Sequence, residues 1–167
     1  TISSPATSTD RTLTLPDEAG TVLTTATAGV PIGGPAFSAY ASGATTLSAG
    51  TITKILFDTE EYDTNSNFAS SRFTPTVAGY YLCITAWAAG STPSDLRCYL
   101  YKNGTSFKRM GAAIYNVLGN WTGGSAMAYC NGTSDYLEMY GFSNAANTTG
   151  TGADLSYFQA SMVRSAV

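Results

Sequence analysis

The feature that most limits the fold of this chain is the uninterrupted apolar run from Tyr80 to Trp87. Its side chains alternate between two sets, which are Leu82, Ile84 and Ala86 on one side and Tyr81, Cys83, Thr85 and Trp87 on the other. This period of two predicts a β-strand. Both sets are largely apolar, whereas a sheet in a soluble protein usually leaves one face to water. We therefore expect the second face to be covered by another sheet or by another chain.

The rest of the chain predicts an all-β protein built from many short strands. Strand-like runs separated by turn residues span 36–42, 51–58, 80–89, 96–104, 125–132, 136–142 and 155–163. Lys102-Asn103-Gly104 and Asn131-Gly132 are typical of the turns that join strands into hairpins. No apolar period of 3.6 residues persists for ten residues, so this spacing favours a sandwich or jelly roll.

The chain of 167 residues is long enough for one main domain. Residues 1–34 are rich in Thr, Ala, Gly and Pro and offer few side chains from which a core could be built. We expect this segment to be an extended stalk or connector, and residues 35–167 to form the globular head.

Charge and cysteine content exclude several classes of function. Charged residues make up 11% of the chain and the net charge is −3, so no basic stripe is present to neutralise nucleic-acid phosphates. No run approaches the roughly 20 apolar residues that would insert across a membrane. Cys83, Cys98 and Cys130 are odd in number and each falls in a strand-like run, which predicts buried free thiols.

The residue types do not favour an enzyme. The chain has no His, and this excludes most hydrolase triads, the zinc-peptidase motif and general bases that use an imidazole. Glu60, Glu61 and Asp63 form the densest acidic cluster, and we interpret it as a solvated loop rather than as the carboxylate pair of a glycosidase. Clustered carboxylates could hold calcium; no other cofactor or metal is expected.

Several motifs in order resemble the C1q-like globular domain. The segment 57-FDTEEYDTNSNFASSRFTPTVAGYYLCITAW-87 carries a Phe-Asp pair, an Asn-rich and aromatic loop and a Phe-Thr-x-Pro-x-x-Gly-x-Tyr pattern; further matches are 35-PAFSAYAS-42, 99-YLYKNG-104, 135-DYLEMYGF-142 and 157-YFQASMV-163. The resemblance covers residues 35–167 and implies a ten-strand jelly-roll sandwich, similar to tumour necrosis factor, that assembles as a homotrimer. We expect Tyr81, Trp87 and Tyr157 at the interface of that trimer. The chain lacks a collagen-like Gly-x-y repeat, which argues against a complement protein proper.

The first segment carries a second resemblance. The stretch 13-LTLPDEAGTVLT-24 is similar to an element near the distal ends of bacteriophage tail fibres. Together the two resemblances imply a fibre on the virion, assembled in the host cytoplasm and ending in a trimeric knob, with residues 1–34 joined to other virion proteins. The alternatives are a structural knob that decorates the capsid or a head fibre, and a secreted bacterial C1q-like adhesin.

Recognition of a host receptor is the activity that the sequence favours. The segment 115-YNVLGNWTGG-124 places aromatic rings beside amides, a combination suited to sugar rings through apolar contact and hydrogen bonds. Its predicted receptor-binding residues, for a glycan or a protein on the host cell surface, are Tyr115, Asn116, Asn120 and Trp121. As an alternative, Trp121 is a packing residue at the edge of a strand. The polar segment 144-NAANTTGTGAD-154 is a second candidate loop.

Overall fold

The computed structural model describes residues 34–113 and 121–166, which belong to one compact unit. Every regular element in these ranges is a β-strand, so the all-β prediction is confirmed. The expected boundary between stalk and head, at residues 34 and 35, falls where the described residues begin and stays a prediction.

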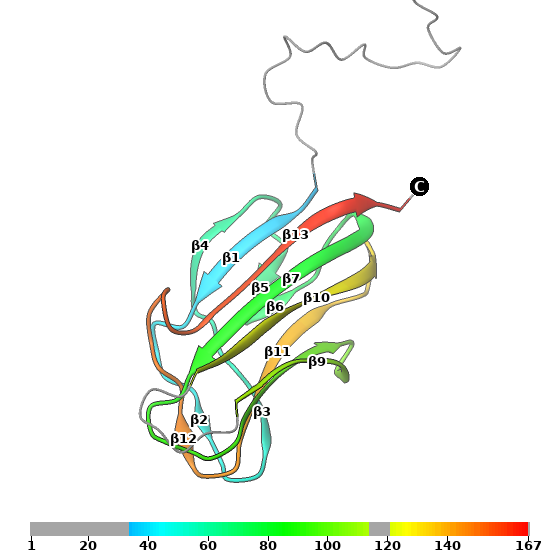
Figure 1. Ribbon diagram of the computed structural model, residues 1–167. Coiled ribbons are helices and arrows are strands. Elements are labelled where there is room, and N and C mark those ends of the chain that lie inside the picture. The colour runs from blue at the N-terminus through cyan, green and yellow to red at the C-terminus, as the bar shows by residue number, and fades with distance from the viewer. Residues whose placement is uncertain (1–33, 114–120, 167) are drawn as a thin grey trace, which may run out of the picture. The chain divides into compact units, whose positions relative to one another are not determined.

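The strands are numbered in chain order (Figure 1). They are β1 (Ala36–Tyr40), β2 (Thr46–Leu47), β3 (Ile52–Lys54), β4 (Thr59–Asp63), β5 (Phe68–Ala69), β6 (Arg72–Phe73), β7 (Ala78–Ala88), β8 (Leu96–Lys102), β9 (Thr105–Ala113), β10 (Trp121–Asn131), β11 (Leu137–Ser143), β12 (Asn147–Thr148) and β13 (Tyr157–Ser165). The number exceeds the expected ten because tight turns, such as the one at Ser70 and Ser71, divide the chain into short pieces.

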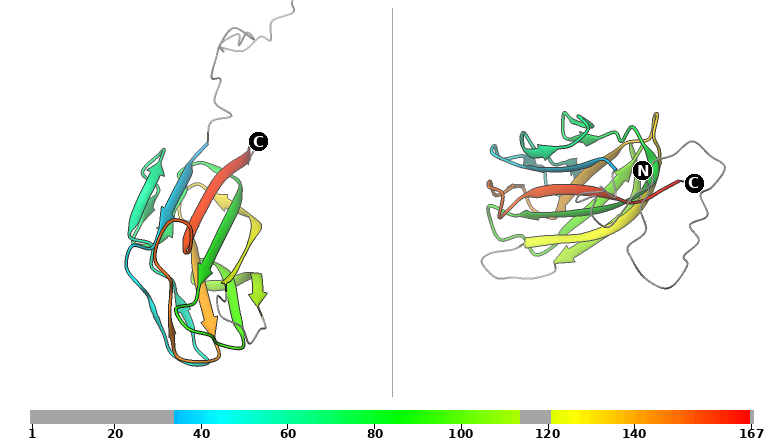
Figure 2. Two further views of the ribbon diagram at one scale, coloured as in Figure 1. Left: turned by 60° about the vertical axis from the view of Figure 1, so that its left-hand side comes forward. Right: turned by 90° about the horizontal axis from the view of Figure 1, so that it is seen from above.

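The strands form two main sheets that lie as separate layers (Figure 2). The first sheet has the order β10-β7-β13-β1-β4, and the second has the order β5-β6-β11-β8-β9, with β3 also paired to β11. β2 and β12 form a small separate pair. Neighbours in both main sheets are antiparallel, as the jelly-roll prediction requires.

The core between the two layers is rich in aromatic rings. Phe37 from β1 stacks on Phe68 with ring centroids 4.4 Å apart and meets Phe158 edge-on at 5.0 Å. β7 adds Tyr81, Cys83 and Trp87, all of which are fully buried. The apolar run Tyr80–Trp87 therefore turns these side chains toward the opposite sheet, which covers one of its two faces.

Six strands were not expected from the sequence: the two-residue strands β2, β5, β6 and β12, and the longer strands β4 and β9. β4 contains Glu60, Glu61 and Asp63, so the acidic cluster is an edge strand rather than the predicted loop. β9 pairs with β8 through the turn at Asn103 and Gly104, both of which have positive φ (54° and 75°). Conversely, only 52–54 of the expected run 51–58 is a strand.

The prediction of free, buried cysteines is confirmed. Cys83, Cys98 and Cys130 are unpaired and fully buried. Burial raises the pKa of Cys98 to about 12 and that of Cys130 to about 11, which keeps both groups as unreactive thiols at neutral pH.

We expect thiol titration to find three reactive groups per chain in denaturant and almost none in the folded protein, since burial blocks the reagent and suppresses the thiolate. Titration with a coloured disulfide reagent, with and without guanidinium, measures both values. One thiol per chain in denaturant would instead indicate a disulfide.

Candidate functional site

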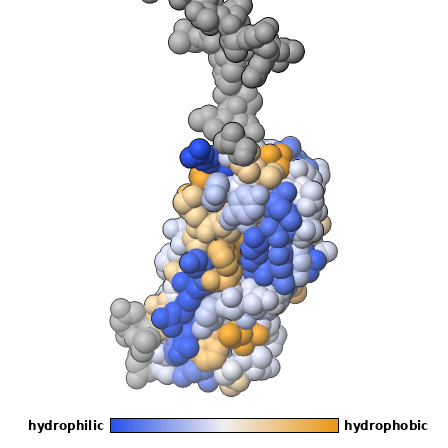
Figure 3. All heavy atoms as spheres, turned by 90° about the vertical axis from the view of Figure 1, so that its right-hand side faces the viewer, coloured by the Kyte–Doolittle hydropathy of each residue, from blue (hydrophilic) through white to orange (hydrophobic). Residues whose placement is uncertain are grey.

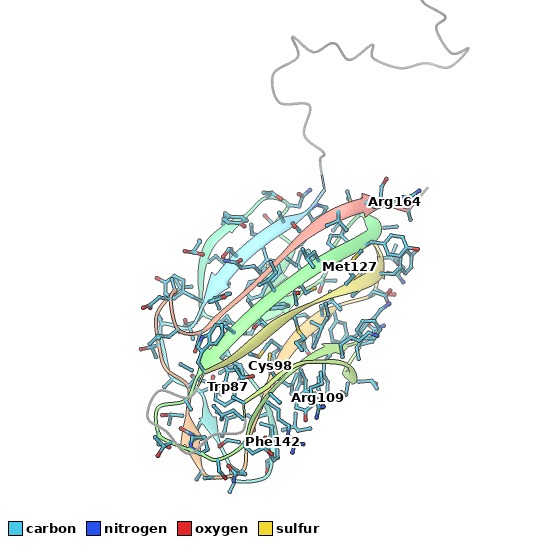
Figure 4. The ribbon with its side chains drawn as sticks, in the orientation of Figure 1. Trp87, Cys98, Arg109, Met127, Phe142 and Arg164 are labelled. Carbon is cyan, nitrogen blue, oxygen red and sulfur yellow. The ribbon has the colours of Figure 1, made fainter. Side chains whose placement is uncertain are left out.

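The outer side of the first sheet carries a continuous apolar surface. Its residues, here called the apolar face, are Tyr80, Leu82 and Ile84 from β7 and Met127 and Tyr129 from β10. Strand register places Tyr80 opposite Tyr129 and Leu82 opposite Met127, and the two Tyr ring centroids are 5.4 Å apart. Met127 is 53% exposed and Tyr80 is 44% exposed; Figure 4 marks Met127 on β10. A contiguous apolar patch of this kind marks an interaction surface.

Two hollows flank the apolar face. The first, of about 330 Å³, lies between Trp121 and Tyr157, and its floor includes Gly123. A Cβ atom at Gly123 would collide with the backbone of Thr85, so glycine both permits the close pairing of β10 with β7 and leaves the hollow empty. The second, of about 500 Å³, lies beside Tyr80 and Tyr129 and is bordered by Arg164, which Figure 4 places near the end of β13.

The structure locates one of the four predicted receptor-binding residues. Trp121 is the first residue of β10, opposite Ala88, and is 48% exposed; it is therefore not a buried packing residue of the single chain. Tyr115, Asn116 and Asn120 lie outside the described residues. The hollow brings Trp121 together with Tyr157, which was predicted for the trimer interface and is half-buried on the same face.

The burial of two predicted interface residues corrects their assignment. Tyr81 and Trp87 are fully buried in the core of the single chain. The Tyr81 hydroxyl donates to the backbone carbonyl of Val77 at 2.6 Å, and the Trp87 indole donates to that of Arg97 at 3.3 Å. Their alternate neighbours on β7 face outward instead, so the surface open to a second subunit is formed by Tyr80, Leu82 and Ile84.

Cationic side chains gather on the second sheet. Its strands carry Lys54, Arg72, Arg97, Lys102, Lys108 and Arg109. Buried or partly buried carboxylates pair with four of them: Glu138 with Lys54 and Arg72, Asp95 with Arg97, and Asp135 with Lys102. Figure 3 shows hydrophilic side chains gathered in distinct groups on the side of the molecule where β9 lies. The two sheets thus present surfaces of different chemistry.

Two of these carboxylates titrate below their ordinary range. Burial opposes ionisation of Glu138, but hydrogen bonds from Lys54 and Arg72 outweigh it and hold its pKa below 4.5. A hydrogen bond from the Asn103 side chain, aided by Lys102, lowers the pKa of Asp135 below 3.8. The folded state therefore binds fewer protons than the unfolded state when the pH approaches these values.

We expect the free energy of unfolding to fall on acidification. The contribution of Glu138 and Asp135 is fully present above their ordinary pKa values, 4.5 and 3.8, and is lost as the pH falls through the lower folded-state values. Urea unfolding at neutral pH and at about pH 3 measures the change. Glu138→Gln should flatten the dependence; an unchanged acid profile in that variant would contradict this assignment.

The acidic edge strand does not form a metal site among the described residues. No three carboxylate or cysteine side chains there converge as a metal cluster. Glu61 accepts a hydrogen bond from the Ser38 hydroxyl at 2.6 Å, and Asp63 accepts one from the backbone N–H of Phe68 at 2.7 Å. Across the same residues, no helix has the length and apolar character needed to cross a membrane.

Comparison with solved structures identifies the fold. The globular domain of zebrafish complement 1qA is similar with a TM-score of 0.58 at 16% identity, over 79% of this chain and 99% of that one. Murine APRIL gives 0.63 at 8% identity, over 78% and 100%, and Eiger TNF from S. frugiperda gives 0.61 at 12%, over 80% and 96%. Neither a protein-family model nor a curated protein matches the sequence.

The head therefore has the C1q/tumour necrosis factor-like jelly-roll fold, and the fold implied by the sequence motifs is confirmed. At these identities the likeness concerns the fold alone. The function of a domain with such a fold depends on its own surfaces.

Proposed function

We propose that this chain is the non-enzymatic, homotrimeric head of a virion fibre that binds a receptor on the host cell surface. The observation that carries the proposal is the apolar face of the first sheet. A soluble chain with few charges gains by covering such a surface, and closed threefold symmetry covers it without open-ended assembly.

The occupant of the apolar face is a second copy of this chain. A hollow lies beside Tyr80 and Tyr129 at one end of the face, and the centre of the face contains no charged side chain. Depletion of charge with aromatic and Met enrichment is typical of the core of a protein–protein interface. The residue resemblance to C1q-like domains, which implies a homotrimer, agrees with this assignment.

The virion role rests on the N-terminal motif. The stretch 13-LTLPDEAGTVLT-24 resembles a tail-fibre element and directly precedes the head. Within the head, strand register places Trp121 at the end of β10 farthest from the pairing of Asn131 with Ala78. Gly34, where the described chain begins, lies against Met162 near that other end of the sheet. Trp121 therefore lies at the opposite end of the sheet from Gly34. In a fibre that continues from Gly34, the Trp121 end would be the tip that meets a receptor.

Binding of the purified trimer to a panel of bacterial strains and to an array of their surface polysaccharides tests this function. We expect saturable binding to at least one strain, and Trp121→Ala should weaken it by about 1–3 kcal/mol while leaving the trimer intact. Thr151→Ala, at an exposed position in the other candidate segment, is the matched control. Binding to none of the cells or glycans would favour a decoration protein; a monomeric Trp121→Ala would place this ring in the subunit interface.

A further inference from the structure

An open polar hollow of about 470 Å³ lies beside the turn between β5 and β6. Two cationic side chains, Lys54 from β3 and Arg72 from β6, lie on its wall. None of the described residues that line it is acidic, and the others are Ser66, Asn67, Ala69, Ser70, Thr74 and Thr76. The hollow is on the second sheet, whereas the apolar face is on the first.

A buried carboxylate fixes both cations in place. Lys54 Nζ and Arg72 Nε donate to the same oxygen of Glu138, Oε1, at 2.8 and 2.9 Å. The Glu138 side chain is 3% exposed, whereas that of Arg72 is 44% exposed. The positive charges of Lys54 and Arg72 exceed the single negative charge of Glu138, so the wall of the hollow has a formal net charge of +1. Glu138 is thus a positioning residue that orders the cations without cancelling them.

The wall carries hydrogen-bond donors that are unused by the described residues. The Arg72 guanidinium lies 3.8 Å over the Tyr136 ring and donates through Nε, but neither Nη group has a hydrogen-bond acceptor in that part of the chain. Lys54 donates a second hydrogen bond to the Ser70 carbonyl at 2.9 Å, which leaves its third proton free. The hydroxyls of Ser66, Ser70 and Thr74 have no described partner either, so an anionic, acceptor-rich ligand fits the hollow.

The turn that frames the hollow is held in an uncommon conformation. Ser70 and Ser71 have φ values of 52° and 56°, a region that costs energy for residues other than glycine. Ser71 is buried, and its Oγ accepts from the Phe57 N–H at 2.8 Å and donates to the Phe57 carbonyl at 3.1 Å. These bonds fix the turn, which directs the Ser70 carbonyl toward Lys54 and completes a rigid wall.

We propose that this hollow binds the carboxylate of an acidic sugar. The two Nη groups of Arg72 form the bidentate fork that matches a carboxylate, and Lys54 adds its free proton. The hydroxyls of Ser66, Ser70 and Thr74 bond the hydroxyl groups of the sugar ring. A bare inorganic anion would occupy only part of about 470 Å³ and would leave these hydroxyls unused.

This site deepens the proposed function, because the identification of the sugar as part of a host polysaccharide rests on the receptor-binding role. The anion site itself rests only on the contacts of Lys54, Arg72 and Glu138. Binding of a defined saccharide and binding to whole cells can therefore be measured separately.

Isothermal titration of the full chain with trigalacturonate, with the neutral galactotriose and with sodium sulfate tests the proposal. We expect saturable binding of trigalacturonate that weakens as salt rises, and binding of the other two probes roughly tenfold weaker or more.

Arg72→Gln should weaken trigalacturonate binding by about tenfold. Arg109→Gln, which removes the same charge from an exposed position on β9, should leave it unchanged. Thr74→Val tests the site while keeping both cations, and we expect a loss of about threefold.

Several results would overturn the proposal. They are no binding of trigalacturonate, equal binding of galactotriose, equal binding of sulfate, or equal losses in Arg72→Gln and Arg109→Gln. If Arg72→Gln fails to fold, unchanged binding by Thr74→Val decides against the site. A head that binds cells but not trigalacturonate refutes the acidic-sugar site alone; a head that binds trigalacturonate but no cell refutes the receptor function alone.

Discussion

Leu82→Glu should convert the protein from a trimer to a monomer. Leu82 lies near the middle of the apolar face, opposite Met127 and beside the half-exposed Ile84. A carboxylate there would have to be buried without a partner when subunits associate, which costs several kcal/mol per subunit. In the monomer the same side chain points to solvent, so the fold should persist. Light scattering after size-exclusion chromatography measures the mass.

Ile52→Glu is the matched control for this change. Ile52 is also an exposed aliphatic residue on a strand, 41% accessible, but it lies on β3 of the second sheet. We expect this variant to remain a trimer. A trimeric Leu82→Glu, or equal dissociation of both variants, would show that the apolar face is not the subunit interface.

Trp87→Ala should destabilise the head by about 3–5 kcal/mol, the range for truncating a fully buried large aromatic residue. Trp87 is completely buried, and its ring fills the space against Gly141, where an added Cβ would come within 3.1 Å of the ring. Truncation leaves a cavity and removes the hydrogen bond from the indole to Arg97. Urea unfolding at a fixed protein concentration measures the loss.

The chain provides its own control, because it has two Trp residues. Trp121 is 48% exposed at the start of β10, so Trp121→Ala should cost the single chain less than about 1 kcal/mol. Equal losses from the two substitutions would contradict the placement of Trp87 in the core and of Trp121 on the surface.

The strand periodicity of the sequence was enough to predict the sheet content but not the direction of every face. The pattern of Tyr80–Trp87 predicts a strand with two apolar sides, and it does not indicate which side faces the core. The aromatic pair Tyr81 and Trp87 faces the core, where both side chains are fully buried between the layers. Assigning them to a subunit interface was wrong for that reason.

The two longer strands that sequence reasoning missed, β9 and β4, lack an alternating pattern. Most of β9 is exposed and mixes polar, charged and apolar residues without a period of two; its place is set by the hairpin at Asn103 and Gly104. β4 is at the edge of the first sheet, where carboxylates discourage pairing with other chains. In both strands tertiary pairing, rather than local residue pattern, determines the structure.

The polar hollow could not be found from spacing in the sequence. Glu138 is separated from Arg72 by 66 positions and from Lys54 by 84. Only the pairing of β11 with both β3 and β6 brings the three side chains together. By contrast, the Trp121 segment was recognisable because its aromatic and amide residues are neighbours in the chain.

The mass of the unmodified protein in solution, measured by light scattering at micromolar concentration, tests most directly whether the head assembles as a homotrimer. A trimer of roughly three times 17.4 kDa is expected. A stable monomer of 17.4 kDa at that concentration would contradict the proposed assembly.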